Sequence, residues 1–446
     1  MRKSILLVFI SLLVFGSNAL GQESLDLEKA IQLGLENNLQ IKIAVDNVAL
    51  REGEKKIGAG DLFMPQVDAT YLRSYSNEDV TQKFVNDPAP REIDNARSRN
   101  ENFNIVGIYG FRPESVITMK RLGQLTEISE LESKIAVENT VAGISTAYYR
   151  LILELQRYQV LKETLRLSKA RLDIAQAQYE LGGAGKRDFL TAQVDYNSDS
   201  SLLLTQEQII QNAKVNLNEL MAINPDQDFL VQDTITIDQQ LSFAELEDNA
   251  FMENKLLLIN QRLKNVAFLQ TRELQASRLP ILNLNGSYVN NTSNSDAGFL
   301  IQNQRQGFNY GGNITVNLFS GLTLNRRIQN AKVQQRIQDY SLEQYEIQLQ
   351  SDIQRAYNTY ETNLKLLTIE EKNFQVAREN TEIALERFRL GIASYLEFRD
   401  AQVNLLTAEN RLITSIYQIK EQEIELMRLS GKIFFQNSAE DFSINP

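Results

Sequence analysis

The feature that most constrains the fold of this chain is an internal repeat. Residues 179–194 and 388–403 align without a gap at a spacing of 209 residues, and seven of the aligned pairs are identical. The same spacing pairs Ala147-Tyr148 with Ala356-Tyr357. Further upstream, Asn38 matches Asn254 and Pro65 matches Pro280. A match of this length predicts a tandem duplication in which both halves follow one structural plan.

Each copy is predicted to contain a helix, a pair of strands, a very long helix, a glycine-containing break and a further helix. Between about 126 and 181, apolar residues recur at alternating steps of three and four, which is typical of helices that supercoil around one another. Such a helix would be about 80 Å long. A glycine just past a helix end favours a tight turn. Gly182 and Gly391 therefore predict two helical hairpins, with their tips at 182–187 and 391–396.

Apolar and polar residues alternate in two short segments of each copy, which predicts strands. The predicted strands cover about 65–76, 102–112, 280–290 and 307–318. The polar stretches between them, 76–101 and 290–306, are predicted to be long loops.

One face of these strands is apolar and aromatic, while the other is rich in Asn, Thr and Ser. A soluble sheet packed on a core gives the same period, but a polar inner face is typical of a membrane barrel with a water-filled interior. Four strands cannot close such a barrel, and open sheet edges are not tolerated in lipid. The strands are therefore expected to be shared between chains, eight from two copies or twelve from three.

Composition narrows the function. The chain has no His and no Cys, and its formal net charge is −11. Imidazole-dependent catalysis and thiolate metal sites are thereby excluded, and the acidic balance argues against a nucleic-acid partner. We predict no cofactor, no metal site and no enzymatic activity. A carboxylate-dependent hydrolase is the weaker alternative, because rods offer poor enclosure for a pocket.

The predicted organisation has five parts. Residues 1–21 combine a basic start, a short apolar run and small residues, as in a signal peptide. Repeat one follows at 22–221, and a linker or equatorial segment that contains Pro225 covers 222–248. Repeat two covers 249–430, and a C-terminal tail covers 431–446.

The chain resembles the TolC-type outer-membrane efflux protein family (outer membrane factors). The resemblance covers nearly all of the mature chain. It rests on the duplicated order, on the two Gly-x-Ala…Phe…Ala-Gln tips, and on Leu27-Glu28-x-Ala30-Ile31 with Glu36-Asn37-Asn38.

The resemblance implies a mainly α fold with a small β part. Long antiparallel coiled helices would form a trimeric α-barrel in the periplasm, and a shared 12-stranded transmembrane β-barrel would lie in outer-membrane lipid. The homotrimer would be the passive exit duct of a tripartite efflux or type I secretion system for small molecules or proteins. Its partners would be a periplasmic adaptor (membrane fusion) protein and an inner-membrane pump of RND or ABC type. An exported coiled-coil scaffold or adhesin without a pore is the alternative, but it leaves the strands unexplained.

The resemblance also implies a periplasmic gate. The acidic residues that project into the pore in this family match Glu397 and Asp400, which lie three residues apart and so on roughly one helix face. Six carboxylates from three chains would converge on the axis and favour cations. An acidic pair near a turn is equally compatible with a solvated helix face.

The hairpin tips are the implied contacts to the adaptor, with Gly182, Ala184, Gly391 and Ala393 as their residues. In some relatives a Tyr and an Arg near the tip hold the closed state, but the matching positions here are Phe388 and Ala393. Neither can make those links. Other contacts are expected to hold the gate, with Arg387, Arg389 and Arg399 as candidates.

Overall fold

The computed structural model of the chain describes residues 24–85, 87–183, 185–231, 233–238 and 240–433. The predicted signal peptide at 1–21, most of the predicted tail and the tip residue Ala184 lie outside the described residues.

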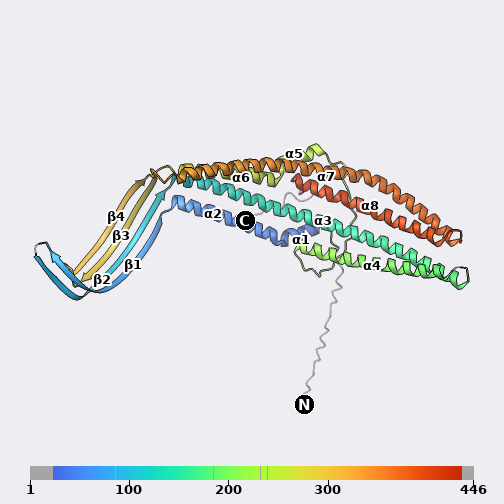
Figure 1. The fold of residues 1–446 in the computed structure, drawn as a ribbon, viewed down its shortest axis with the longest axis horizontal. Coiled ribbons are helices and arrows are strands. Elements are labelled where there is room, and N and C mark those ends of the chain that lie inside the picture. Colours follow the sequence, from blue (N-terminus) through green and yellow to red (C-terminus); the bar gives the residue numbers. More distant parts are fainter. Residues whose placement is uncertain (1–23, 86, 184, 232, 239, 434–446) are drawn as a thin grey trace, which may run out of the picture. The chain divides into compact units, whose positions relative to one another are not determined.

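Within the described residues, one series of elements occurs twice (Figure 1). Each series has two helices, two strands and two helices. The first consists of α1 (Leu27–Asn37), α2 (Leu39–Phe63), β1 (Gln66–Phe84), β2 (Asp87–Phe111), α3 (Pro113–Glu180) and α4 (Lys186–Met221). The second consists of α5 (Phe243–Glu253), α6 (Lys255–Ala276), β3 (Ile281–Ser295), β4 (Gln302–Thr315), α7 (Thr323–Arg389) and α8 (Tyr395–Leu429).

The helix that precedes the strands is divided in both copies at the matched asparagines. Asn38 and Asn254 have similar non-helical backbone angles, with φ near −60° and ψ of 122° and 115°. The side-chain amide of Asn38 donates to the carbonyl of Leu220 at the end of α4 (3.3 Å), and that of Asn254 donates to the carbonyl of Leu429 at the end of α8 (3.0 Å). The repeat therefore extends to individual hydrogen bonds.

The long helix of copy one starts earlier than predicted. It begins at Pro113 rather than near 126, and continues for 68 residues. Proline is favoured at the first helical position because its missing N–H has no intrahelical partner there. Glu114 in the first turn complements the positive end of the helix dipole.

The four strands form one antiparallel sheet in the order β1-β2-β3-β4. The predicted loop at 76–101 is wrong, because the ladder continues through it to the pair Val80–Ile93 and beyond. The predicted loop at 290–306 is too long, because the pairing of β3 with β4 continues to Asn294–Gln302. Polar side chains predominate there on both faces, so the period of two disappears from the sequence while the backbone pairing remains. At its other end β4 stops at Thr315, three residues before the predicted limit.

The register gives the sheet two chemically distinct faces, because directly paired residues share a face. We call the first the apolar face; its members include Val67, Tyr71, Phe103, Ile105, Leu284, Tyr288, Phe308 and Tyr310. We call the second the polar face; its members include Asp68, Thr70, Asn102, Asn104, Asn283, Asn285, Asn309 and Asn313.

The compact units of the chain do not coincide with the two repeats. One unit comprises residues up to Leu39 together with Asn139–Phe243 and Arg355–Arg428. The other comprises Gln40–Glu138, Ala244–Gln354 and the residues from Leu429. Each repeat contributes to both units, since α3 and α7 are long enough to take part in two.

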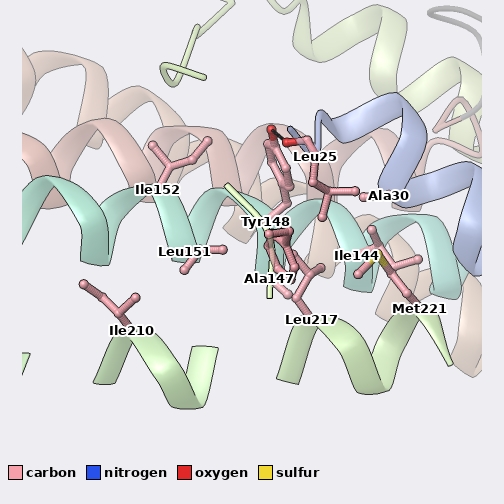
Figure 2. Packing of buried hydrophobic residues seen from close by; sticks show 11 residues of the cluster. Leu25, Ala30, Ile144, Ala147, Tyr148, Leu151, Ile152, Ile210, Leu217 and Met221 are labelled. Atoms are coloured by element: carbon pink, nitrogen blue, oxygen red, sulfur yellow. Dashed lines mark hydrogen bonds between the residues drawn. The ribbon is translucent and has the colours of Figure 1, made fainter. Parts of the chain in front are cut away.

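The first unit has its apolar core where α1, α3 and α4 meet (Figure 2). Ile144, Tyr148 and Leu151 on α3 are fully buried and face Leu217 and Met221 on α4. Their spacing of three and four residues is that of the predicted supercoil seam. The core therefore follows from the apolar periodicity of the sequence.

α1 reaches this core by a close approach at Gly34. A Cβ placed on Gly34 would lie 2.1 Å from a methyl carbon of Ile144. A side chain at this position would force Ile144 to move, so glycine allows the two helices to approach at this distance.

In the second unit, ion pairs fix α6 against both long helices. Glu273 of α6 accepts from Arg121 (2.8 Å) and Thr118 (2.9 Å) of α3, while Lys264 of α6 lies 3.1 Å from Asp339 of α7. Among the described residues, no helix has the length and apolarity that crossing a membrane would require.

Candidate functional site

Both hairpin tips end their long helix in the same capped turn. Gly182 and Gly391 have positive φ angles of 75° and 72°. At the first tip the N–H of Gly183 donates to the carbonyl of Gln178 (2.8 Å), and at the second the N–H of Ile392 donates to the carbonyl of Arg387 (2.9 Å). These six-to-one bonds, with the accompanying five-to-two bonds, define the Schellman motif. Gly182 and Gly391 therefore have a structural role at the tips.

The two predicted gate residues are exposed on the first turns of α8. The backbone N–H of Ser394 donates to the Glu397 carboxylate (3.1 Å), and the N–H of Glu397 donates to the Ser394 hydroxyl (3.3 Å). This reciprocal pair is a capping box, which the spacing Ser394-x-x-Glu397 signals in the sequence. Glu397 thus starts the helix that carries it, while Asp400 is exposed one turn further on.

The two residues that replace the Tyr and Arg of some relatives pack in an apolar cluster. Phe388 stacks on Phe398 with ring centroids 5.6 Å apart, and Ala393 is buried beside them. The predicted tip contact Ala393 therefore has a buried side chain in this structure.

The three candidate arginines near the tip differ in what they contact. Arg389 pairs with Glu386 on its own helix (2.7 Å), and Arg387 supplies the carbonyl of the capped turn. Arg399 reaches the other hairpin, where its guanidinium lies 3.1 Å from Asp199 of α4. Of the three, Arg399 makes the cross-hairpin contact.

Arg399 belongs to a larger set of polar side chains between the two hairpins, which we call the hairpin-bridging network. Arg171 lies at its centre and is completely buried. Its guanidinium donates to Gln402 (2.9 Å) and to Asp195 (3.1 Å), and stands 4.9 Å from the ring centre of Tyr395. The network comprises Ser168 and Arg171 of α3, Asp195 and Asp199 of α4, and Tyr395, Arg399 and Gln402 of α8.

Gln402 and Tyr395 complete the links between the helices. The Gln402 amide donates to the carbonyl of Thr164 and to the hydroxyl of Ser168, both at 3.0 Å. Ser168 in turn donates to Asp199, and the Tyr395 hydroxyl donates to Asp195. The network therefore joins α3, α4 and α8 through groups that are mostly withdrawn from water.

The charges in this network are balanced, with two arginines against two aspartates. Burial lowers the pKa of Arg171, although nearby Tyr395 and Asp195 favour its charged form. Burial, and then the hydrogen bond to Asp195, raises the pKa of Tyr395. Arg171 stays charged and Tyr395 stays a neutral donor at physiological pH. Because a buried ion pair contributes little net stability, its best attested role is to specify one arrangement of helices.

The repeat does not predict the network. At the matched position of the other copy, Arg171 corresponds to Asn380, Asp199 to Ala408 and Arg399 to Leu190. Ser168 is visible in the sequence as a polar interruption of the seam between Leu165 and Leu172. The available signal was thus the set of seam positions where the copies differ.

Comparison with known proteins shows which proteins share this architecture. The model of the family described as outer membrane efflux protein matches residues 253–432. The probable efflux pump outer membrane protein TtgC of Pseudomonas putida is 21% identical over 93% of this chain and 84% of its own length.

Solved channels share the fold. The CmeC outer membrane channel of Campylobacter jejuni superposes with a TM-score of 0.77 at 17% identity, over 92% of this chain and 87% of its own. The outer membrane protein VceC of Vibrio cholerae gives 0.75 at 16% identity, over 91% and 96%. The fold is therefore that of an outer-membrane channel subunit.

Residues 253–432 match the outer membrane efflux protein family, which confirms the resemblance drawn from the sequence. TtgC, CmeC and VceC are each described as outer-membrane proteins or channels.

Proposed function

We propose that this protein is the outer-membrane exit duct of an efflux system and conducts its cargo passively to the exterior. Three copies would pool their sheets into one 12-stranded transmembrane β-barrel and their hairpins into a periplasmic α-barrel. The homotrimer would work with a periplasmic adaptor protein and an inner-membrane pump of RND or ABC type. TtgC, a relative over most of the chain, is described as part of an efflux pump, which favours efflux over protein secretion.

The observation that carries this proposal is the two-faced sheet with two free edges. Among the described residues, β1 and β4 pair on one side only. Lipid cannot satisfy the N–H and C=O groups of an open edge, so each edge needs a strand from another copy. β1 and β4 run in opposite directions, hence β4 of one copy can extend β1 of the next as an antiparallel pair. The apolar face would then meet lipid and the polar face would line the channel.

We assign the periplasmic gate to the tip of the copy-two hairpin. Glu397 and Asp400 would project towards the axis, where three copies gather six carboxylates. The hairpin-bridging network supports this assignment, because it ties α8 to the copy-one hairpin at positions on either side of these residues. Opening would require Arg399 and Gln402 to leave their partners on α3 and α4.

The two tips would contact the adaptor through Gly182, Ala184, Gly391 and Ala393. For Gly391 the support is the capped turn, which sets the shape that the tip presents. Ala393 would contribute through the packing that holds this turn, since its side chain is buried.

The experiment that tests the proposal is reconstitution of the purified protein. We expect a trimer by mass in detergent and discrete conductance steps in planar bilayers. A deletion strain should accumulate pump substrates and regain efflux with the intact gene. A monomer without conductance, or a pore-free scaffold in the soluble periplasm, would contradict it.

A further inference from the structure

The apolar face of the sheet changes character at one well-defined level. On β2 its apolar part extends from Phe111 to Phe103, which is nine residues. A tilted strand needs about 9–11 residues to cross the hydrocarbon layer. The next pair of residues on this face is Arg73–Glu101, and the pair after that is Tyr75–Arg99. Two arginines therefore lie immediately beyond the apolar band.

These charged residues form one compact cluster. The Arg73 and Arg99 guanidiniums both contact the same oxygen of Glu101, at 2.9 Å and 2.8 Å from their Nε atoms. Arg73 also lies 5.2 Å from the ring centre of Tyr75. The arginine side chains keep 40% and 44% of their surface exposed. The cluster is thus held in place on one side and open on the other.

Glu101 cannot satisfy both arginines. Each guanidinium carries five N–H donors, whereas a carboxylate offers about four lone-pair sites. At least six donors therefore point to other acceptors, and the cluster carries one net positive charge. A guanidinium is best matched by an anionic group that presents two acceptor oxygens to two parallel N–H donors, and a phosphate group does so.

We infer that Arg73 and Arg99 form a binding site for the phosphate groups of the outer-leaflet glycolipid, lipopolysaccharide. The inference rests on the proposed function, because the apolar face must meet lipid. β1 follows α2 and β2 precedes α3, so both strands join their helices at the end far from the arginine cluster. In the proposed channel that end faces the periplasm, and the cluster therefore faces the outer leaflet. Glu101 is two residues beyond Phe103, about 7 Å along the strand, which is the depth of the headgroup layer.

The test measures lipopolysaccharide binding to the full-length channel in phosphatidylcholine nanodiscs. Arg73→Gln with Arg99→Gln should weaken binding about tenfold or more, since two charge-assisted contacts are lost. Removing the phosphates from lipid A should have the same effect as removing the arginines. The wild type should therefore bind dephosphorylated lipopolysaccharide as weakly as the double Gln variant binds intact lipopolysaccharide. Glu101→Gln raises the cluster charge to two and should tighten binding several-fold.

Arg305→Gln is the matched control. Arg305 pairs with Asn291 on the polar face of the same sheet, one residue row from the Glu101 level, and is exposed. It removes one positive charge, against two in the double variant, and should leave binding unchanged. Arg73→Lys with Arg99→Lys keeps the charge but loses the bidentate donors, so its binding should fall between that of the wild type and that of the Gln variant. If the Gln variant fails to assemble, weaker binding by the Lys variant supports the inference and unchanged binding overturns it.

The outcomes separate this inference from the proposed function. The inference is overturned if lipopolysaccharide binds the Arg73→Gln/Arg99→Gln variant or the Glu101→Gln variant as it binds the wild type. It is also overturned if dephosphorylated lipopolysaccharide binds the wild type as tightly as the intact lipid, or if Arg305→Gln weakens binding as much as the double variant does. In each of these cases, normal conductance would still support the proposed channel. Binding that depends on Arg73 and Arg99 in a protein without conductance would support the inference and overturn the proposed exit duct.

Discussion

At the scale of single residues, Arg171 is the most demanding feature of the molecule. It is a completely buried cation whose partners, Asp195, Gln402 and Tyr395, come from two other helices. A cation left in this position without its partners would be strongly destabilising, so the network tolerates one arrangement of the hairpins far better than any other.

Arg171→Met should therefore destabilise the helical part of the protein by about 2–3 kcal/mol, because Asp195 and Gln402 each lose a hydrogen bond to the guanidinium. Urea unfolding followed by circular dichroism measures the change. Arg166→Ala is the control on the same helix: its pair with Glu163 is exposed, and losing it should change stability by no more than about 1 kcal/mol. Equal effects of the two substitutions would contradict the role of the network.

Tyr360 gives the first unit a defined response to alkaline pH. Its hydroxyl donates to the carbonyl of Asp238 in the linker. Burial, assisted by the Glu423 carboxylate, raises the pKa of Tyr360 to about 12, against about 10 in an unfolded chain. Since the folded-state pKa is the higher one, the contribution of the neutral phenol is complete below about pH 10 and is lost between about 10 and about 12.

Tyr360→Phe should be less stable by about 1 kcal/mol at pH 8, where the hydrogen bond is intact. The difference from the wild type should shrink as the pH rises through the window, because the wild type alone loses this contribution. Urea midpoints taken at intervals from pH 8 to 12 measure the difference. A constant gap across the range would show that Tyr360 does not titrate with folding.

The candidate site could be predicted from the sequence only where it follows the repeat. Gly182 and Gly391 are matched positions, and both are capped turns as predicted. Arg171 and Asp199 occupy positions where the other copy has Asn380 and Ala408, so the repeat marks them only as differences and does not indicate their partners. Their partners are on helices far apart in sequence, and helical periodicity does not encode which hairpin faces which.

At the scale of elements, the hairpins depend on the backbone at their tips. Gly391 has a φ of 72°, and no neighbouring atom lies within 4 Å of a Cβ built there. Space is therefore not the constraint at this position; the left-handed conformation is. Gly53, inside α2, is equally open but has ordinary helical geometry.

Gly391→Ala should consequently destabilise the tip by about 1 kcal/mol through backbone strain, whereas Gly53→Ala should stabilise the protein by about 0.5–1 kcal/mol. Hydrogen exchange of the amides at 391–394, together with urea unfolding, measures both effects. We also expect Gly391→Ala to weaken crosslinking to the adaptor while trimer assembly stays normal. Stabilisation by both substitutions would rule out the left-handed cap as the constraint.

The elements themselves were predictable wherever a periodicity survived. The supercoil seam of α3 predicted a rod-like helix, and alternation predicted the inner parts of all four strands. The outer part of β1 and β2 was missed, because residues such as Arg99 and Glu101 are polar on what is otherwise the apolar face. Pairing there is held by the backbone ladder and cross-strand ion pairs, neither of which leaves a hydrophobic period.

At the scale of the whole molecule, a homotrimer would convert a pair of exposed carboxylates into a ring. One copy places Glu397 and Asp400 on the first turns of α8, where each is solvated and exerts little influence alone. Three copies around an axis would superimpose their fields within a narrow passage that excludes bulk water. The effect on ions should therefore depend on assembly rather than on either residue by itself.

Glu397→Ala with Asp400→Ala should relieve block by multivalent cations on the order of tenfold and raise single-channel conductance in planar bilayers, because charge is removed where the pore is narrowest. Asp188→Ala is the matched control, since Asp188 is the copy-one counterpart of Glu397 at the other tip. That tip belongs to the outer hairpin in the proposed barrel, so its carboxylate should not affect permeation. Glu397→Gln separates charge from capping: it keeps a capping partner for Ser394 but should weaken cation block in part. If Asp188→Ala changed block as much as the double variant, the copy-two hairpin would not form the gate.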